Sequence, residues 1–348
     1  MYAIHAIDHD LWQITLPAPQ FHPILPAAHP INVYLLLGKA PTLLHTGHPV
    51  QHIALSRALH QIGCPPERIE RVITTGWSMH LMGNIQSFPG AELYLYSPTM
   101  VEPRDYAIQA QRERDEWESV VHELLEHHGY DAITTREEMD HFFEEYFPPV
   151  RSKLDFTPVR EGHTIRAGRR ALQVLHTPGP QPHHISLWEP DTKELFSGEV
   201  TLEGLPYRMH EVHSYLESQD RLIALGAESL FPNYDQPTFG ASRVTQKLRR
   251  GQRFLNNFLM NATSALHGAP DLITFSEQDL GYKPSQVPRF ALTLLAHRTF
   301  FEELVRSRGI TAAGDGLTRR YGVDLEPAPS HKAIRHSPSL MPLGPDDL

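Results

Sequence analysis

The sequence predicts a layered α/β fold, and two features of its first hundred residues carry that prediction. Apolar runs over 31–37 and 92–96 are typical of buried strands, and apolar residues at helical spacing lie between them over 53–62. A β-branched strand at Val72 and Ile73 then runs into a polar turn that contains His80. Alternating strands and helices favour an α/β protein, which places its chemistry where strands end in polar turns.

The remaining elements follow in two blocks. Strands are expected over 11–16, 31–37, 41–47, 71–73, 92–96, 156–159, 164–167, 171–176, 184–188, 194–198 and 229–234, with helices over 53–62 and 212–225. Two helical segments, 104–128 and 136–146, interrupt the β pattern. They predict either a cover over the mouth of the site or a plain helical insertion, and the pattern does not separate the two.

The C-terminal third changes character. Helices are expected over 243–266 and 284–308, and a hairpin over 311–323 with Gly-Asp-Gly at its turn. Helices followed by a hairpin suggest a small winged-helix-like unit. The predicted organisation is therefore 1–240 with a helical insertion at about 100–150, then 241–325, then a disordered tail over 326–348 that is poor in apolar residues.

Composition argues against several classes of function. The net charge of −10 provides no basic field for nucleic acid or an anionic membrane. The start of the chain lacks a signal peptide pattern, and no apolar stretch approaches the ~20 residues of a membrane-spanning helix. Cys64 is the only cysteine, which suits a reducing cytoplasm, and we expect a cytoplasmic protein. Basic residues on the C-terminal helices favour a solvated face or a homo-oligomer contact over DNA.

Six blocks resemble signature blocks of the metallo-β-lactamase superfamily, in the family's order. They are Asn32-Val-Tyr-Leu, Leu43-Leu-His-Thr-Gly47, Thr74 to Asn84, Leu175-His-Thr-Pro-Gly179, Phe196-Ser-Gly-Glu199 and Phe231-Pro-Asn-Tyr-Asp235. The resemblance covers roughly residues 10–240 and implies an αββα sandwich. The C-terminal helices and hairpin resemble the winged-helix extension of some glyoxalase II-like hydrolases in that family.

The same resemblance implies a site for two metals, usually Zn²⁺, but most ligand positions are substituted. The positions of metal-binding histidines hold Thr75, Trp77, Pro180 and Tyr234, the aspartate of the loop is Met79, and the aspartate of the Asp-Thr-Gly turn is His45. Only His80 and the carboxylate of Glu199 remain. Of the two histidines after Pro180, at most one points inward because they alternate in a strand, and His184 is the candidate. We therefore expect a site degenerate in metal ligands, lined by these residues.

The second metal position keeps some donors, and two interpretations stay open. His80, Glu199 and Tyr234 could hold a single transition metal, or they could hydrogen-bond to one another and fill the former cavity without metal. At the first metal position no metal is expected, and no cofactor is expected overall.

Two function hypotheses follow. The first is a small-molecule-binding or regulatory pseudo-hydrolase that has lost the dinuclear zinc site. The second is a non-classical enzyme, a hydrolase or lyase of esters, thioesters or lactones, that uses Glu199 and His80 as an acid–base pair or a single metal at His80, Glu199 and Tyr234. A DNA-binding regulator is the weakest interpretation.

Overall fold

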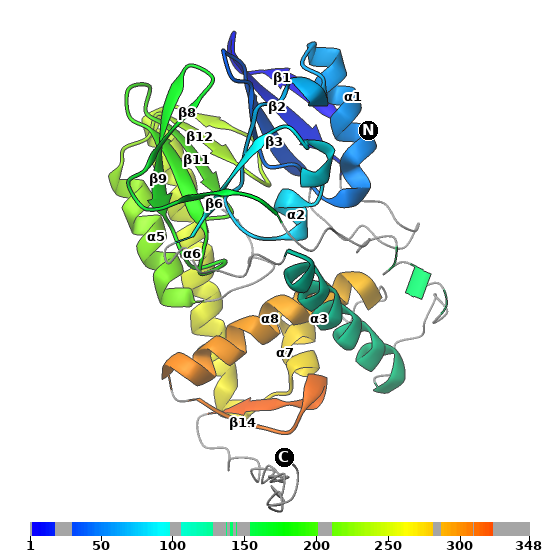
Figure 1. Ribbon diagram of the computed structural model, residues 1–348. Helices are drawn as coiled ribbons and strands as arrows, with labels where there is room; N and C mark the ends of the chain where they lie inside the picture. The colour runs from blue at the N-terminus through cyan, green and yellow to red at the C-terminus, as the bar shows by residue number, and fades with distance from the viewer. Residues whose placement is uncertain are drawn as a thin grey trace, which may run out of the picture.

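Two β-sheets lie face to face with helices on their outer sides, as Figure 1 shows for this computed structural model. The structure describes residues 2–17, 30–97, 106–127, 154–200, 211–280, 287–308 and 310–322, together with 137, 140, 141 and 144. The αββα sandwich expected from the sequence is confirmed.

The first sheet has seven strands in sequence order. They are β1 Ala3–Ala6, β2 Leu11–Leu16, β3 Ile31–Leu36, β4 Thr42–Leu44, β5 Arg71–Ile73, β6 Glu92–Tyr96 and β7 Thr157–Val159. The pairs from β1 to β4 are antiparallel, and those from β4 to β7 are parallel. β3 is buried on both faces, so its apolar run is continuous rather than alternating with polar residues.

The second sheet has six strands and follows the order β13-β12-β11-β10-β9-β8. Its strands are β8 Thr164–Ala167, β9 Arg170–His176, β10 Ile185–Glu189, β11 Glu194–Gly198, β12 Ser229–Pro232 and β13 Thr238–Phe239. Only the β11–β12 pair is parallel in this sheet.

Three apolar clusters correspond to the layers of the sandwich. Alternate residues of one strand enter different clusters: Val33 packs on the helix side of the first sheet, whereas Tyr34 packs between the sheets against Phe196 and Phe231. Helices α1 His52–Ile62, α2 Met79–Met82 and α3 Tyr106–His127 contribute to the outer cluster of the first sheet. Helices α5 Val212–Ala224 and α6 Ala241–Ala265 cover the second sheet.

The C-terminal part continues from α6 and packs on α3. It contains α7 Leu272–Leu280, α8 Val287–Arg308 and an antiparallel pair formed by β14 Thr311–Ala313 and β15 Arg320–Gly322. α8 lies against α3 below the sandwich in Figure 1, and the Glu123 carboxylate of α3 accepts a hydrogen bond from the Leu317 N–H. The arrangement as a winged helix stays a prediction.

Short 3-10 turns complete the described elements. They are η1 Pro49–Gln51, η2 Pro66–Arg68, η3 Ile85–Ser87, η4 Leu266–Gly268 and η5 Gly316–Thr318. Two sequence expectations fall mainly outside the described residues, namely the helix over 136–146 and the tail over 326–348. None of the helices in the described part of the chain has the length and apolar character needed to cross a membrane.

Candidate functional site

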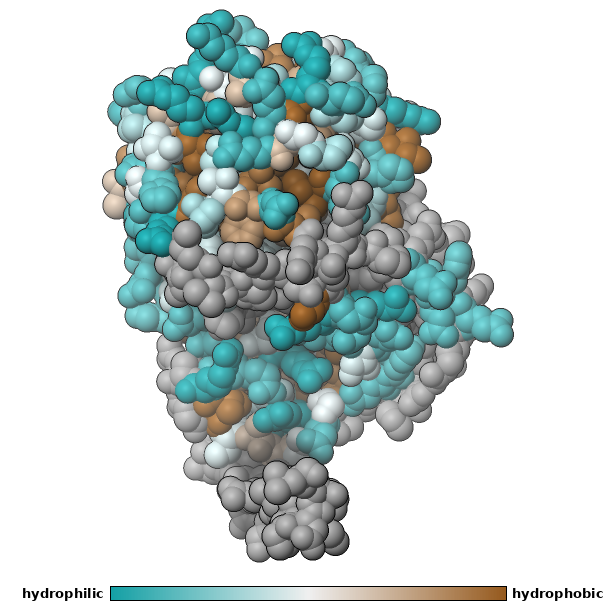
Figure 2. Space-filling model, in the orientation of Figure 1, coloured by the Kyte–Doolittle hydropathy of each residue, from teal (hydrophilic) through white to brown (hydrophobic). Residues whose placement is uncertain are grey.

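The signature blocks meet where strands of both sheets end. His45 follows β4, Thr75 follows β5, Glu199 follows β11 and Tyr234 follows β12. The pairs β4–β5 and β11–β12 are parallel, so their carboxyl ends lie at a common edge. In Figure 2 hydrophobic residues gather in the middle of the sandwich half of this face, between β6 and α2.

The Glu199 carboxylate is held by hydrogen bonds at both oxygens. The Tyr234 hydroxyl donates to Oε1 at 2.9 Å, and the Gln181 amide nitrogen donates to Oε2 at 3.3 Å. The carbonyl oxygen of Glu199 accepts from the Tyr215 hydroxyl at 3.2 Å. The residue is buried, with 7% of its surface exposed. Each carboxylate oxygen therefore accepts a hydrogen bond from a protein side chain.

Gln181 connects Glu199 to the loop that follows β5. Its amide oxygen accepts from the backbone N–H of Trp77 at 2.8 Å, while its amide nitrogen faces Glu199. The side chain therefore bridges two segments that, by the resemblance, would otherwise supply metal ligands. Sequence reasoning missed this residue, and the available signal was a polar side chain directly after Pro180 in a signature block.

His184 is buried and fixed in one neutral tautomer. The backbone N–H of Glu199 donates to its Nε2 at 3.0 Å, so Nε2 carries a lone pair and Nδ1 carries the hydrogen, which faces the Thr177 carbonyl at 2.9 Å. Burial lowers the pKa of His184 to about 3, and the hydrogen bond to Thr177 opposes this only in part. His184 therefore positions Glu199 and has no nitrogen left to bind a metal.

Gly198 explains why the segment before Glu199 packs so closely. Its φ of +62° lies in the left-handed region, and a Cβ there would lie 2.4 Å from His184 Nε2 and 2.8 Å from Thr75 Oγ1. Thr75 is itself buried, and its carbonyl accepts from the Ile185 N–H at 2.9 Å. Thr75 thus joins the two sheets at a position where, by the resemblance, the family has a metal-binding histidine.

His45 is a buried histidine with a positive φ of 69°, an uncommon backbone conformation for a residue other than glycine. Burial lowers its pKa to about 3, and the side chain of Asn233 opposes this only in part. His45 is thus neutral at pH 7. In this neutral form His45 adds no charge to the site. Its ring lies close enough to His184 that the two rings oppose each other's protonation, which lowers the pKa of His184 further.

His80 lies in α2 beside a second histidine that the sequence analysis did not single out. The rings of His80 and His48 are 5.3 Å apart between centroids. Burial, and after it the proximity of His80, lowers the pKa of His48 well below its ordinary value. Asn84 fixes this corner, because its amide donates to the carbonyls of Thr46 and His48 at 2.8 and 2.7 Å.

The inserted helix α3 supplies a buried carboxylate to the same loop. Glu113 Oε2 accepts from the backbone N–H of Met79 at 3.1 Å, and only 3% of the Glu113 surface is exposed. This places α3 directly on the loop that carries His80. The indole of Trp77 donates to the Tyr96 carbonyl at 3.3 Å and packs edge-on against Phe156, with 5.7 Å between ring centroids. Trp77 contributes its backbone N–H to the Gln181 contact and directs its ring to the sheet.

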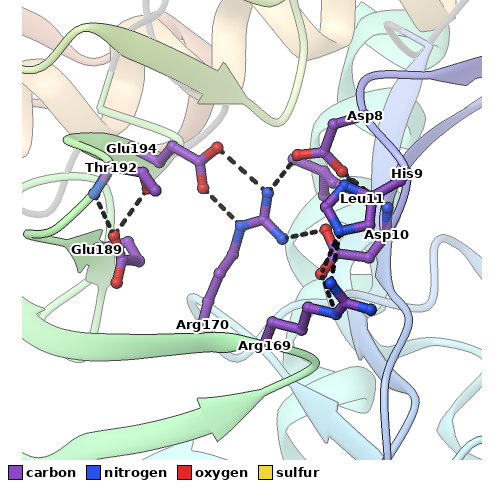
Figure 3. A network of polar contacts seen from close by, with 9 residues as sticks. All are labelled: Asp8, His9, Asp10, Leu11, Arg169, Arg170, Glu189, Thr192 and Glu194. Atoms are coloured by element: carbon purple, nitrogen blue, oxygen red, sulfur yellow. Dashed lines mark hydrogen bonds and ion pairs between the residues drawn. The ribbon is translucent and has the colours of Figure 1, made fainter.

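The residues do not fit a dinuclear zinc site. Thr75, the Trp77 indole, the Met79 thioether and the buried Pro180 supply no imidazole or carboxylate, and both ring nitrogens of His184 are engaged. Among the described residues, groups of three or more metal-binding side chains with donor atoms within 4.8 Å are Asp8-His9-Asp10 and Glu118-His122-Asp140. Neither includes His80 or Glu199. In the first group Arg169 and Arg170 already pair with the carboxylates (Figure 3).

The structure thus brings together part of the expected set. Tyr234 and Glu199 share a hydrogen bond, and Thr75 and His184 pack around Gly198 beside them. The ring of His80 lies against that of His48, a residue outside the expected set. The further residues Gln181, His48, Glu113 and Tyr215 were absent from the sequence-based set.

Comparisons with known proteins agree with this fold. Residues 119–234 match the family model described as the metallo-beta-lactamase superfamily. A metallo-beta-lactamase family protein from Thermus thermophilus superposes with a TM-score of 0.65 at 21% identity, over 91% of this chain and 99% of that one. Residues 119–234 therefore resemble the metallo-β-lactamase superfamily, and the chain as a whole has the fold of that Thermus thermophilus protein. A beta-lactamase domain protein from Burkholderia ambifaria shows the same fold, with a TM-score of 0.62 at 17% identity over 92% and 93% of the two chains.

Curated relatives within the metallo-β-lactamase superfamily match shorter stretches. An acyl-coenzyme A thioesterase, MBLAC2, from Gallus gallus is 34% identical over 140 residues, which is 35% of this chain and 48% of that protein. The Homo sapiens protein of the same name is 36% identical over 95 residues, or 25% and 33% of the two chains. The chain therefore spans between a third and about half of the length of these relatives. The metallo-β-lactamase fold usually binds metal, which makes the donor set described above a departure from the usual pattern.

Proposed function

We propose that this chain is a small-molecule-binding or regulatory pseudo-hydrolase of the metallo-β-lactamase superfamily, with a pocket that works without two zinc ions. The Gln181 side chain carries this proposal, because its amide links the Trp77 N–H to the Glu199 carboxylate. The amide gives both groups a hydrogen-bond partner, so the two segments are joined by a protein side chain. The hydrophobic residues between β6 and α2 favour a ligand with an apolar part.

The alternative is a non-classical hydrolase, and two observations favour keeping it. Similar proteins carry the name acyl-coenzyme A thioesterase, which points to thioesters among the candidate substrates of ester, thioester and lactone type. The Glu199–Tyr234 pair also joins a carboxylate to a phenol at 2.9 Å, an arrangement able to move a proton. In this alternative Glu199 would act as the base, with His80 or a single metal at His80, Glu199 and Tyr234 as its partner.

Metal content and thioester hydrolysis, measured on the same sample, separate the two functions. We expect protein purified without added metal to contain far less than one transition metal per chain, and to hydrolyse acyl-coenzyme A no faster than its Glu199→Gln variant does. A stoichiometric metal that is lost in His80→Ala would overturn the metal-free pocket. Hydrolysis that disappears in Glu199→Gln and in Tyr234→Phe would establish the hydrolase instead.

A further inference from the structure

The Gln181 carboxamide lies in a small site formed by the Trp77 N–H, the Glu199 carboxylate and Gly76, which we call the cradle. A donor, the Trp77 N–H, faces its oxygen at 2.8 Å, and an acceptor, the Glu199 carboxylate, faces its nitrogen at 3.3 Å. The orientation of the amide is fixed by these partners, because an N–H can only donate and a carboxylate can only accept. The cradle therefore distinguishes the carbonyl end of an amide from its N–H end.

The floor of the cradle is a glycine that the backbone does not require. Gly76 is not among the glycines with positive φ, so an alanine could adopt its conformation. A Cβ at this position would nevertheless lie 2.9 Å from the Gln181 amide oxygen and 3.1 Å from its amide carbon. The absence of a side chain at Gly76 thus leaves room for a carboxamide group, independently of the two hydrogen bonds.

The walls of the cradle are held by contacts that do not involve Gln181. Tyr234 and Tyr215 donate to Glu199, and His184 accepts from its backbone. The Thr75 carbonyl just before Gly76 accepts from the Ile185 N–H. Gln181 itself is only partly buried, and it precedes the exposed Pro182. The Gln181 side chain is therefore less constrained than the groups that form the cradle around it.

We propose that this cradle is a binding site for ligands that carry a carboxamide or ureido group, and that the Gln181 side chain is its resident occupant, which such a ligand displaces. The inference rests on the proposed small-molecule function and names the chemical class of the ligand. A carboxylate is disfavoured because it would face the charge of Glu199 without a proton to share. An ester or ketone can accept from Trp77 but leaves Glu199 without its second donor.

Removal of the occupant tests the proposal, with propionamide as the probe and 2-butanone as a probe of similar size that lacks the N–H donor. We expect Gln181→Ala to bind propionamide at least about tenfold more tightly than the wild type does, because no side chain has to leave first. Saturating propionamide should raise the Tm of Gln181→Ala by about 2–4 °C, and 2-butanone should not. The control Gln236→Ala removes an exposed glutamine side chain and should respond like the wild type.

Two further measurements keep the test decisive if Gln181→Ala folds poorly. Gln181→Met fills the space without either polar group and should not respond to propionamide. In the wild type, the side-chain NH₂ resonances of Gln181 should move toward solvent-exposed values as propionamide is added. Equal stabilisation of Gln181→Ala by both probes, or unchanged Gln181 resonances at saturation, would overturn the carboxamide site. If the protein is shown to be metal-free, either of these results overturns only the carboxamide site and leaves the proposed metal-free function unaffected. A stoichiometric metal, in contrast, would contradict the proposed function itself.

Discussion

At the scale of single residues, the site is built around neutral histidines that lie close to Glu199. His184 accepts the backbone N–H of Glu199, and this contact requires the ring to stay unprotonated at Nε2. His45 is buried close by and is likewise neutral. Protonation of either ring would place a positive charge in a buried position with few groups to stabilise it. Protonation of these histidines therefore favours the unfolded chain.

The pKa of His184 predicts how stability depends on pH. Burial lowers this pKa from 6.5 to about 3, so between these values the unfolded chain binds a proton that the folded chain does not. The stability from this residue is therefore complete well above pH 6.5 and falls as the pH decreases through 6.5 toward 3, by about 1.6 kcal/mol between pH 6.5 and 5. Urea unfolding of the wild type and His184→Gln at both pH values checks this, and the variant should show a smaller loss.

An exposed histidine provides the control for that experiment. His213 has 78% of its side chain exposed, and His213→Gln should retain the pH dependence of the wild type. If His184→Gln and His213→Gln lose the same free energy of unfolding between pH 6.5 and 5, His184 does not carry the dependence. The residual slope in His184→Gln would report on the other buried histidines with a lowered pKa, His45 and His48.

The structure brings Glu199, Tyr234, Thr75 and His184 of the sequence-based set together, but the sequence could not predict how these residues are hydrogen-bonded. The substitutions at Thr75, Pro180 and Tyr234 were visible in the signature blocks, and the Glu199–Tyr234 contact follows from them. The role of Gln181 could not be predicted, because it depends on a rotamer that reaches the Trp77 N–H across 104 residues of sequence. Glu113 was hidden for a different reason: the helical spacing of α3 predicts its apolar face and says nothing of which loop that helix meets.

At the scale of elements, an arginine ties the two sheets together at the end remote from the signature loops. Arg170, the first residue of β9, pairs with Asp8 and Asp10 of the β1–β2 turn at 2.7 and 2.8 Å and with Glu194 of β11 at 2.5 Å (Figure 3). Burial alone would raise the pKa of Asp8, but hydrogen bonds from Asp10 and Arg170 lower it to about 2. Asp8 therefore stays ionised, and the Arg170 guanidinium is shared by all three carboxylates.

Arg170→Met should destabilise the sandwich strongly. The change leaves the buried carboxylates of Asp10 and Glu194 without their main counter-charge, and the loss of one partner from a buried ion pair costs about 3–5 kcal/mol. Chemical denaturation measures this loss. The matched control is Arg169→Met: its side chain is 71% exposed and lies 3.8 Å from Asp10, so we expect a loss of about 1 kcal/mol or less. If the two variants lose the same free energy of unfolding, the burial of Arg170 does not determine how much this residue contributes to stability.

Most elements were predictable because their strands show one of two readable patterns, a continuous buried run as in β3 or an alternation of buried and exposed residues as in β8. The strands over 11–16, 164–167 and 194–198 match their predicted bounds. The short strand β1 and the helix α7 were missed. β1 pairs only with β2 at the edge of its sheet and is partly exposed, so its apolar pattern is weak. α7 is nine residues long and is set by its packing on α8.

At the scale of the whole molecule, the core does not stop at the predicted domain boundary near residue 240. The apolar cluster on the outer side of the first sheet includes Trp117 of α3 together with Phe258 of α6 and Phe300 of α8. α6 also covers the second sheet through Val244 and Leu248. A single cluster shared in this way makes the stability of the sandwich depend on the C-terminal helices.

A chain that ends at residue 240 should therefore not fold as the sandwich does in the full protein. Four α3 side chains that are at most 1% exposed, Trp117, Val120, Val121 and Leu124, would lose the cover of α8, and each such side chain contributes about 1.5–3 kcal/mol when buried. We expect the shortened protein to aggregate or to bind a hydrophobic dye, as gel filtration and dye fluorescence would show. A chain that ends at residue 325 removes only the predicted tail and should keep the Tm of the full protein. If the chain ending at 240 instead unfolds cooperatively at that same Tm, the sandwich is an independent domain and the shared cluster contributes little to its stability.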